Sequence, residues 1–219
     1  MVSIKEAIHA MKSAFIHLSN GIAHIPPRLN FDFPDKNASS LVMPAYAIGN
    51  PYYCVKIVSI NYSNPKRGLP LIHSIIQVFN ASQGNQIATF DGESITAIRT
   101  AAASGLATDL MAKKDAYICA IFGTGVQATF HMRAIMEIRN IEKFIIFSRN
   151  EGTASKFCDL HNKNIKCEIG SKKTLKESDI ICTTTPSKIP LIEFDSIRSG
   201  CHLNVIGSHQ PMMREVSSD

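Results

Sequence analysis

A glycine-rich turn at residues 121–128 carries the clearest chemistry in the sequence. Gly123 and Gly125 are followed by Ala128 in the spacing Gly-x-Gly-x-x-Ala, after an apolar stretch and before a helix-forming one. Glycines at these positions allow a tight turn and a close approach of backbone to a pyrophosphate, and the N-terminus of the following helix favours the anion. A strand, turn, helix and second strand at the expected spacing favour dinucleotide binding over an ordinary tight turn.

The residues after the second expected strand of this region bear on which nucleotide is bound. An Asp or Glu there would bind both ribose hydroxyls, but the chain has Ser148, Arg149 and Asn150. An arginine beside a small hydroxyl residue can accommodate a 2′-phosphate. We therefore expect NADP to be preferred over NAD. The alternative is that Arg149 is a solvated surface charge.

Thr96, Arg99 and Thr100 form a second candidate group. Their spacing places them on one face of an expected helix, among alanines that would let another surface approach closely. An arginine held among small residues can bind a carboxylate or phosphate through two parallel hydrogen bonds. The spacing supports this role and that of an exposed surface arginine equally.

The helices and strands that we expect from the sequence fall into two domains, with a boundary between residues 112 and 113. In 1–112, a helix over 3–19 with Ser3 as its cap precedes a mostly antiparallel sheet. Strands are expected over 41–47, 53–60, 72–79 and 86–90, and a second helix over 94–112. This domain is expected to be a smaller α+β domain.

Residues 113–219 alternate strands and helices, which is typical of a Rossmann-type parallel sheet in an α/β fold. Strands are expected over 117–122, 143–147, 166–169, 179–184 and 202–206. Helices are expected over 126–139, 153–162 and 174–177. The full doubly wound pattern has about six parallel strands, and fewer are expected here. We therefore expect a parallel sheet that is incomplete at the C-terminus.

The composition excludes several classes of protein. Of 219 residues, 45% are hydrophobic and 19% are charged, which does not suit a disordered chain. The net charge of +5 is spread without a strong basic block, which argues against a nucleic-acid partner. No apolar stretch approaches the about 20 residues that a membrane-spanning helix needs. We expect neither a nucleic-acid nor a membrane partner.

The cysteines and the N-terminus indicate the compartment. The six cysteines form no close pair and show neither a zinc pattern nor a disulfide framework. We therefore expect reduced thiols and no metal site. Lys5 and Glu6 stand where a secretory signal needs an apolar run. These features predict a cytoplasmic protein.

Several segments, taken together, resemble one known family, the ornithine cyclodeaminase/mu-crystallin family. They are 43–46 (MPAY), 55–58 (VKIV), 91–107 (DGESITAIRTAAASGLA), 123–128 (GTGVQA) and 204–208 (NVIGS). The resemblance covers essentially the whole chain. It implies a homodimer built through the first domain, which binds substrate, with the active site between the domains. It also implies hydride transfer between a nicotinamide cofactor, NADP or NAD, and the α-carbon of an amino acid or imine.

The resemblance also implies roles for individual residues. Arg28, Lys56 and Arg99 would hold the substrate carboxylate, and Lys56 could assist proton transfer. The alternatives are an edge-strand lysine that aids solubility and a loop charge at Arg28. A larger set would line the cofactor: Thr96, Thr100, Val126, Gln127, Ser148, one or more of Thr183, Thr184 and Thr185, and the loop of Ile206, Gly207 and Ser208.

The chain departs from the family pattern in two ways. His209 stands where true cyclodeaminases carry an Asp that engages the side-chain amine of the substrate. A histidine can move protons near neutral pH but cannot anchor an ammonium group, which disfavours ornithine as substrate. Family chains also continue past the residues matched by Arg214 and Glu215, so the chain resembles a C-terminally truncated member.

These features leave three hypotheses for function. The first is an NAD(P)-dependent amino-acid dehydrogenase or ketimine reductase, with Lys56 and His209 as candidate catalytic residues. The second is an ornithine cyclodeaminase, a lyase that forms proline and ammonia. The third is a non-catalytic NADP-binding protein or an inactive truncated relative.

Overall fold

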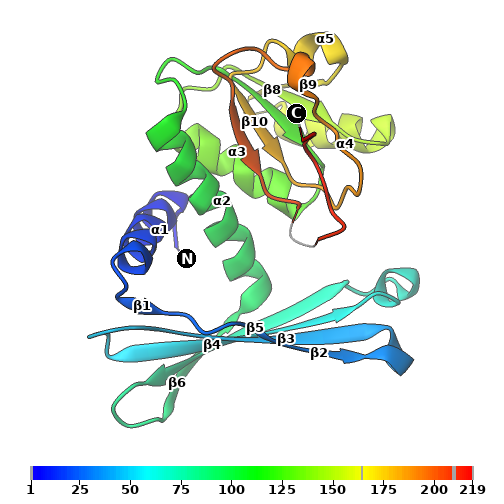
Figure 1. Cartoon of the computed structure of the whole chain (residues 1–219). Helices are drawn as coiled ribbons and strands as arrows, with labels where there is room; N and C mark the ends of the chain where they lie inside the picture. The colour runs from blue at the N-terminus through cyan, green and yellow to red at the C-terminus, as the bar shows by residue number, and fades with distance from the viewer. Residues whose placement is uncertain (1, 164, 209–210, 219) are drawn as a thin grey trace. The chain divides into compact units, whose positions relative to one another are not determined.

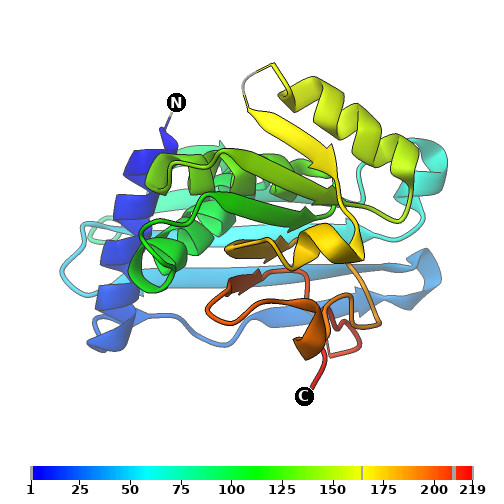
Figure 2. The ribbon, with the colours of Figure 1, turned by 90° about the horizontal axis from the view of Figure 1, so that it is seen from above.

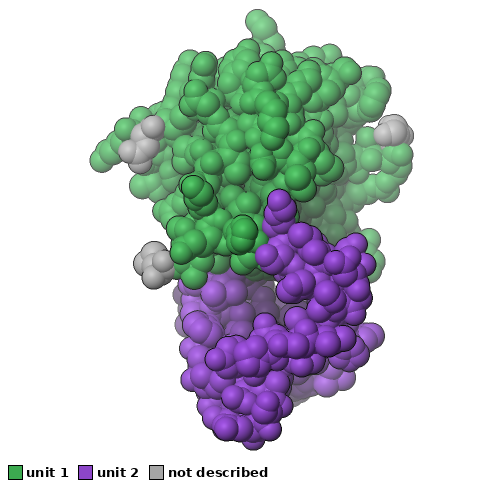
Figure 3. Space-filling view, turned by 90° about the vertical axis from the view of Figure 1, so that its left-hand side faces the viewer, with its two compact units in different colours: residues 1–11, 97–219 green, residues 12–96 purple. Residues whose placement is uncertain are grey.

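The computed structural model describes residues 2–163, 165–208 and 211–218 of the chain (Figure 1). It forms two compact units, which Figure 3 colours separately. Unit 1 comprises Met1–Met11 and Ala97–Asp219, and unit 2 comprises Lys12–Thr96. Helix α2 (Gly92–Met111) begins in unit 2 and continues into unit 1. The functional domain boundary expected at 112/113 stays a prediction.

Unit 1 contains a five-stranded sheet in the order β11-β10-β7-β8-β9, with every pairing parallel. Its strands are β7 (Ile118–Phe122), β8 (Lys143–Phe147), β9 (Lys166–Ile169), β10 (Ile180–Thr183) and β11 (His202–Val205). They lie side by side in Figure 1 and Figure 2. The order reverses direction between β7 and β10, as in a doubly wound sheet. The predicted Rossmann-type parallel sheet is confirmed.

Both faces of this sheet are covered, which explains why its strands are apolar throughout. On one face, Cys119, Ile121 and Phe144 pack in a core cluster with residues of α3 (Val126–Ile138) and α4 (Glu151–His161). On the other face, Ile118, Ala120 and Ile145 pack with Leu175 of α5 (Lys172–Leu175) and with Ile192. Alternate side chains of β7 thus belong to two separate core clusters, one on each face of the sheet.

Unit 2 contains an antiparallel sheet in the order β1-β3-β4-β5-β6, with β2 paired to β3. Its strands are β1 (Ala23–His24), β2 (Leu29–Phe33), β3 (Ala38–Ala47), β4 (Tyr52–Asn61), β5 (Ile72–Asn80) and β6 (Gln86–Asp91). Short 3-10 helices η1 (Pro34–Lys36) and η2 (Asn64–Arg67) lie in two of its connections, and η3 (Phe194–Ser196) lies in unit 1. The strand β2 is absent from the sequence-based prediction.

Helix α1 (Ile4–Ser19) begins where the sequence predicts. The Ser3 hydroxyl accepts the backbone N–H of Glu6 at 3.2 Å, and the Glu6 carboxylate accepts the backbone N–H of Ser3 at 2.8 Å. This reciprocal capping box satisfies donors that a helix start leaves open. The hydrogen bonds that the Ser3 backbone N–H and hydroxyl donate to the Glu6 carboxylate lower the pKa of Glu6 from its ordinary value.

One face of the sheet in unit 2 exposes apolar side chains. Leu29, Phe31 and Phe33 alternate along β2 on one face and are 60%, 43% and 39% exposed. The pairing register places Val42 of β3 on the same face as Leu29, and continues it to Ile57 of β4. We call this surface, defined by these residues, the β2–β4 face.

Candidate functional site

The glycine turn has the geometry that its sequence predicts. Gly123 adopts a φ of +113°, and a Cβ atom there would lie 2.6 Å from the Thr184 hydroxyl, so only glycine fits. Gly125 caps α3 without a side-chain hydrogen bond, and nothing lies within 4 Å of the position of its Cβ. Space is therefore open beside Gly125, where α3 begins after β7. This cradle fits a pyrophosphate group.

The threonine run follows β10, which lies beside β7 where the strand order reverses. The backbone N–H and the hydroxyl of Thr184 both donate to the Phe122 carbonyl, at 2.9 and 2.8 Å. Thr184 is thereby fixed against the glycine turn. Ligands of doubly wound folds bind in the crevice at such a reversal, outside the carboxyl ends of the strands.

A buried carboxylate that sequence reasoning missed holds the same loop. Glu215 has no exposed surface, and its oxygens accept from Thr183, Thr185 and the backbone N–H of Gly207. A Cβ at Gly207 would lie 1.8 Å from the Thr185 carbonyl oxygen, so only glycine fits there too. The family match gives Glu215 no role, and its threonine partners lie 30 and 32 residues away, so only the folded structure reveals what it does.

The expected ribose-binding segment lies at the start of α4. The Asn150 side chain accepts the backbone N–H of Thr153 at 3.2 Å and so caps the helix. The Ser148 and Thr153 hydroxyls are 2.8 Å apart. Arg149 is exposed. Asn150 therefore has a structural role here, and its predicted contact with cofactor stays a prediction.

In unit 2 the structure brings two predicted site residues together. The Lys56 ammonium on β4 donates to the Thr96 hydroxyl at 2.5 Å, and that hydroxyl lies 2.5 Å from the Gly92 carbonyl, to which it donates. The chain Lys56–Thr96–Gly92 thus orients the lysine at the start of α2.

The other predicted residues are placed individually. Arg28 is exposed in the segment between β1 and β2. Arg99 and Thr100 lie in α2, and the exposed Val126 and half-buried Gln127 form the first turn of α3. Ile206 and Ser208 follow β11. His209 lies outside the described residues.

Ser104 and His131 form a buried pair that resembles catalytic machinery but has a structural role. His131 has no exposed surface, and burial lowers its pKa, which favours the neutral ring. Its Nδ1 lies 2.8 Å from the Gln127 carbonyl, so Nδ1 carries the proton and donates it. Nε2 then accepts from the Ser104 hydroxyl at 2.9 Å. Because the pair is sealed from solvent, it joins α2 to α3 rather than meeting a substrate.

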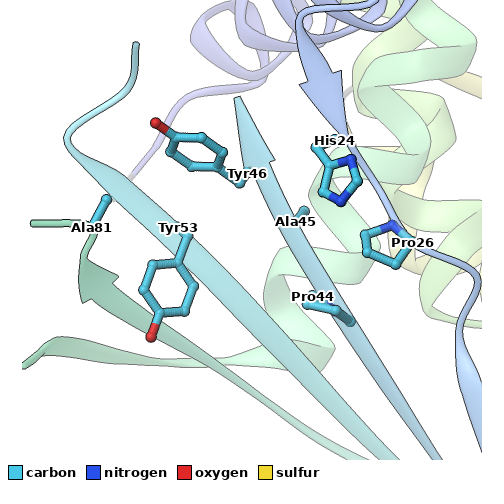
Figure 4. Close-up of a pocket in the computed structure, with 7 residues that line it drawn as sticks. All are labelled: His24, Pro26, Pro44, Ala45, Tyr46, Tyr53 and Ala81. Carbon is cyan, nitrogen blue, oxygen red and sulfur yellow. The ribbon is translucent and has the colours of Figure 1, made fainter. Parts of the chain in front are cut away.

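Unit 2 also carries a groove of about 380 Å³, shown in Figure 4. It contains none of the predicted site residues. Its lining consists of His24, Pro26, Pro44, Ala45, Tyr46, Tyr53 and Ala81. Among the described residues, no group of histidine, cysteine and carboxylate side chains could hold a metal ion. The described helices include none that is long and apolar enough to cross a membrane.

Comparison with known proteins decides the family. The model of the ornithine cyclodeaminase/mu-crystallin family matches residues 1–219. The chain belongs to this family. Its resemblance to the family, and the α/β fold that it implies, are thereby confirmed.

The similar proteins include reductases and dehydrogenases. The chain is 31% identical to a Delta(1)-pyrroline-2-carboxylate reductase of Bacillus cereus over 222 residues, covering 100% of the chain and 68% of the relative. It is 35% identical to the Thermococcus litoralis Delta(1)-pyrroline-2-carboxylate reductase, solved with NADH and L-proline, with a TM-score of 0.90 over 99% of the chain and 68% of that protein. An archaeal alanine dehydrogenase dimer with bound NAD is 28% identical, with a TM-score of 0.92 over 99% of the chain and 67% of that protein.

These relatives define what is established for the chain. It spans about two thirds of the length of the relatives that it matches. The solved relatives hold NADH or NAD, which supports a nicotinamide cofactor. Two solved structures described as cyclodeaminases match at 21% and 23% identity and support the fold alone, and a relative described as an uncharacterized cyclodeaminase of Sinorhizobium fredii is 29% identical. The comparisons therefore favour the reductase hypothesis over the lyase.

Proposed function

We propose that this chain is an NAD(P)-dependent oxidoreductase that transfers a hydride between nicotinamide and the α-carbon of a small amino acid or cyclic imine. The observation that carries the proposal is the glycine turn, which is open beside Gly125 and is bordered at Gly123 by Thr184, where the strand order reverses. This is the position at which dinucleotides bind in doubly wound folds. When bound, the nicotinamide supplies or accepts the hydride.

The proposed substrate is Δ1-pyrroline-2-carboxylate, with alanine or its imine as a second substrate. Relatives at 31% and 35% identity carry the first activity in their names, and one was solved with L-proline. Each proposed substrate, Δ1-pyrroline-2-carboxylate and alanine or its imine, carries a carboxylate on the reacting carbon. Arginine binds a carboxylate with two parallel hydrogen bonds. We assign the carboxylate to Arg28, Arg99 and Lys56.

Lys56 is also proposed to donate a proton to the imine nitrogen during reduction and to accept one from the amine nitrogen during oxidation. Its ammonium donates to the Thr96 hydroxyl, which orients it at the start of α2. His209 is the alternative candidate for proton transfer, since an imidazole titrates near neutral pH.

The preference for NADP is part of the proposal. Arg149 is exposed at the end of β8, and Ser148 beside it presents a hydroxyl. Neither residue is a carboxylate, which would repel a 2′-phosphate. The residues proposed to line the cofactor remain those that the family resemblance implies.

A homodimer through the N-terminal domain completes the proposal. Support comes from the β2–β4 face, whose Leu29, Phe31 and Phe33 are exposed, since exposed apolar patches mark interaction sites. The archaeal alanine dehydrogenase is also described as a dimer. We further propose a cytoplasmic location. All six cysteines are free thiols, as is usual in a reducing compartment.

The decisive assay follows absorbance at 340 nm while the protein meets Δ1-pyrroline-2-carboxylate with NADPH or NADH. Consumption of the reduced nucleotide, with proline as product, is the expected result. Ornithine is the comparison substrate. Ammonia and proline from ornithine without net nucleotide consumption would identify a cyclodeaminase instead. Nucleotide binding without turnover of any of these substrates would leave a non-catalytic binding protein.

A further inference from the structure

Glu215 lies fully buried in unit 1, with 0% of its surface exposed. Oε1 accepts the backbone N–H of Thr185 at 2.8 Å and the Thr185 hydroxyl at 2.6 Å. Oε2 accepts the Thr183 hydroxyl at 2.7 Å and the backbone N–H of Gly207 at 2.6 Å. Each oxygen thus accepts one backbone N–H and one threonine hydroxyl. A buried carboxylate needs such donors, because an unpaired buried charge is costly.

The backbone of Glu215 is fixed as well. Its carbonyl accepts the N–H groups of Leu191 and Ile192, at 2.8 and 3.2 Å. Val216 forms a parallel bridge with Ile192, which is itself 0% exposed. The Glu215 N–H donates to the Ser208 hydroxyl at 3.2 Å. Hydrogen bonds therefore fix the Glu215 backbone, while the side-chain carboxylate bonds to the two loops.

The two loops that it joins are the ones that follow β10 and β11. Between Thr183 and Thr185 stands Thr184, which donates twice to the Phe122 carbonyl beside the glycine turn. Glu215 therefore fixes Thr183 and Thr185, the two neighbours of the threonine that contacts the glycine turn. It fixes Gly207 of the neighbouring loop with the same carboxylate.

We propose that Glu215 is a positioning residue for the nicotinamide nucleotide, holding the Thr183–Thr185 and Gly207 loops in the geometry that the nucleotide needs. This inference rests on the proposed function. Glu215 acts through these loops and does not itself touch the nucleotide, because it is sealed from solvent.

The substitution Glu215→Gln tests the proposal sharply. Because each oxygen faces one backbone N–H, the new amide group opposes an N–H in either orientation, at Thr185 or at Gly207. Threonine hydroxyls can rotate, whereas backbone donors cannot. The loops must then shift, and the unpaired donors cost enough to weaken nucleotide affinity by about tenfold or more. Glu137→Gln, at an exposed position on α3, is the matched control.

Thr183 provides a second, milder test. It is 1% exposed, and its hydroxyl donates to Glu215. Thr183→Val removes one donor to Oε2 without changing the shape of the side chain, whereas Thr183→Ser keeps the hydroxyl. We expect a rise of about threefold to fivefold in the dissociation constant for Val and recovery for Ser.

The measurement is titration of each variant with NADPH and NADH, followed by the emission of the reduced nicotinamide. The chain contains no tryptophan, which lowers the protein background. Circular dichroism and a melting curve confirm that each variant is folded. Where turnover is measured, the KM for nucleotide rises while the KM for imine stays within about twofold, a split that general destabilisation does not produce.

Unchanged nucleotide affinity in folded Glu215→Gln overturns the inference. If that variant does not fold, unchanged affinity in Thr183→Val overturns it, and loss in Val with recovery in Ser supports it. Nucleotide binding by the wild type separates this inference from the proposed function. Absence of binding to the wild type overturns both, whereas binding that none of these substitutions alters overturns only the role of Glu215.

Discussion

The two units of the chain bury their apolar residues very differently. In unit 1, Phe144, Ile121 and Met132 are among the side chains that are almost completely buried, at 0%, 0% and 1% exposure. Among the described residues of unit 2, Val58 is the one apolar side chain in the buried core. The antiparallel sheet instead presents Leu29 and Phe31 to solvent.

This difference separates two tasks. A parallel sheet is covered on both faces and so has a complete core of its own, which can hold loops rigidly at its carboxyl edge. An antiparallel sheet can leave one face uncovered, and that face is then available to another surface. Internal packing therefore supports the proposed nucleotide site of unit 1, whereas the uncovered face of unit 2 is the surface that the proposed dimer would use.

Removal of an arginine from α2 is expected to have the largest effect. Arg99→Ala removes a charged partner of the proposed substrate carboxylate, and we expect a loss of about a hundredfold or more in kcat/KM. Steady-state kinetics with Δ1-pyrroline-2-carboxylate measures it. Arg67→Ala, at an exposed position in η2, is the control and should leave kinetics unchanged. Equal kinetics in both variants would remove Arg99 from the site.

Glycine-to-alanine substitutions compare a packed position, Gly207, with an open position, Gly125, within unit 1. At Gly207 a Cβ meets the Thr185 carbonyl oxygen at 1.8 Å, so Gly207→Ala should reduce the free energy of unfolding by about 3 kcal/mol. At Gly125 nothing lies within 4 Å, and Gly125→Ala should cost less than about 1 kcal/mol. Urea unfolding of the two variants compares them. Similar losses would contradict the account of the loop packing.

A charge on the β2–β4 face tests the need of unit 2 for a partner. Phe31→Asp places a carboxylate among exposed apolar side chains, and we expect the molar mass in light scattering to fall from dimer to monomer. Asn30→Asp adds the same charge to the next residue of β2, which points to the opposite face. That control should remain dimeric. A dimer that persists in Phe31→Asp would exclude this face as the interface.

The smallest expected effect concerns the choice of nucleotide. Arg149→Ala should raise the dissociation constant for NADPH about tenfold, by loss of a charged contact to the 2′-phosphate. The value for NADH should change less than about twofold. Calorimetric titration of both nucleotides gives the ratio. Equal weakening of both would refute a role in 2′-phosphate recognition.

The sequence predicts unit 1 better than unit 2 for a physical reason. Strands such as β7 and β8 are continuous apolar runs between helices, which is the pattern of a covered parallel sheet. The strand β2 escaped prediction because Asn30 and Asp32 disfavour strands and Pro34 follows directly. The alternation of Leu29, Phe31 and Phe33 with these polar residues is the one strand signal that the segment carries.

The candidate site shows the same limit. The glycine turn is predictable because a local backbone conformation requires glycine at Gly123. Glu215 is not, because its partner Thr183 lies 32 residues away and only the sheet order brings them together. The capping role of Asn150 depends on where α4 begins, which the sequence prediction placed two residues later.

The central claim is that unit 1 binds a nicotinamide nucleotide at its glycine turn. Isothermal titration of the wild type and of Gly123→Ala with NADPH and NADH tests it directly. The account predicts saturable binding to the wild type. It also predicts affinity at least about tenfold weaker in the folded variant, since the added Cβ meets the Thr184 hydroxyl at 2.6 Å. Absence of binding to the wild type, or equal affinity in both proteins, would contradict it.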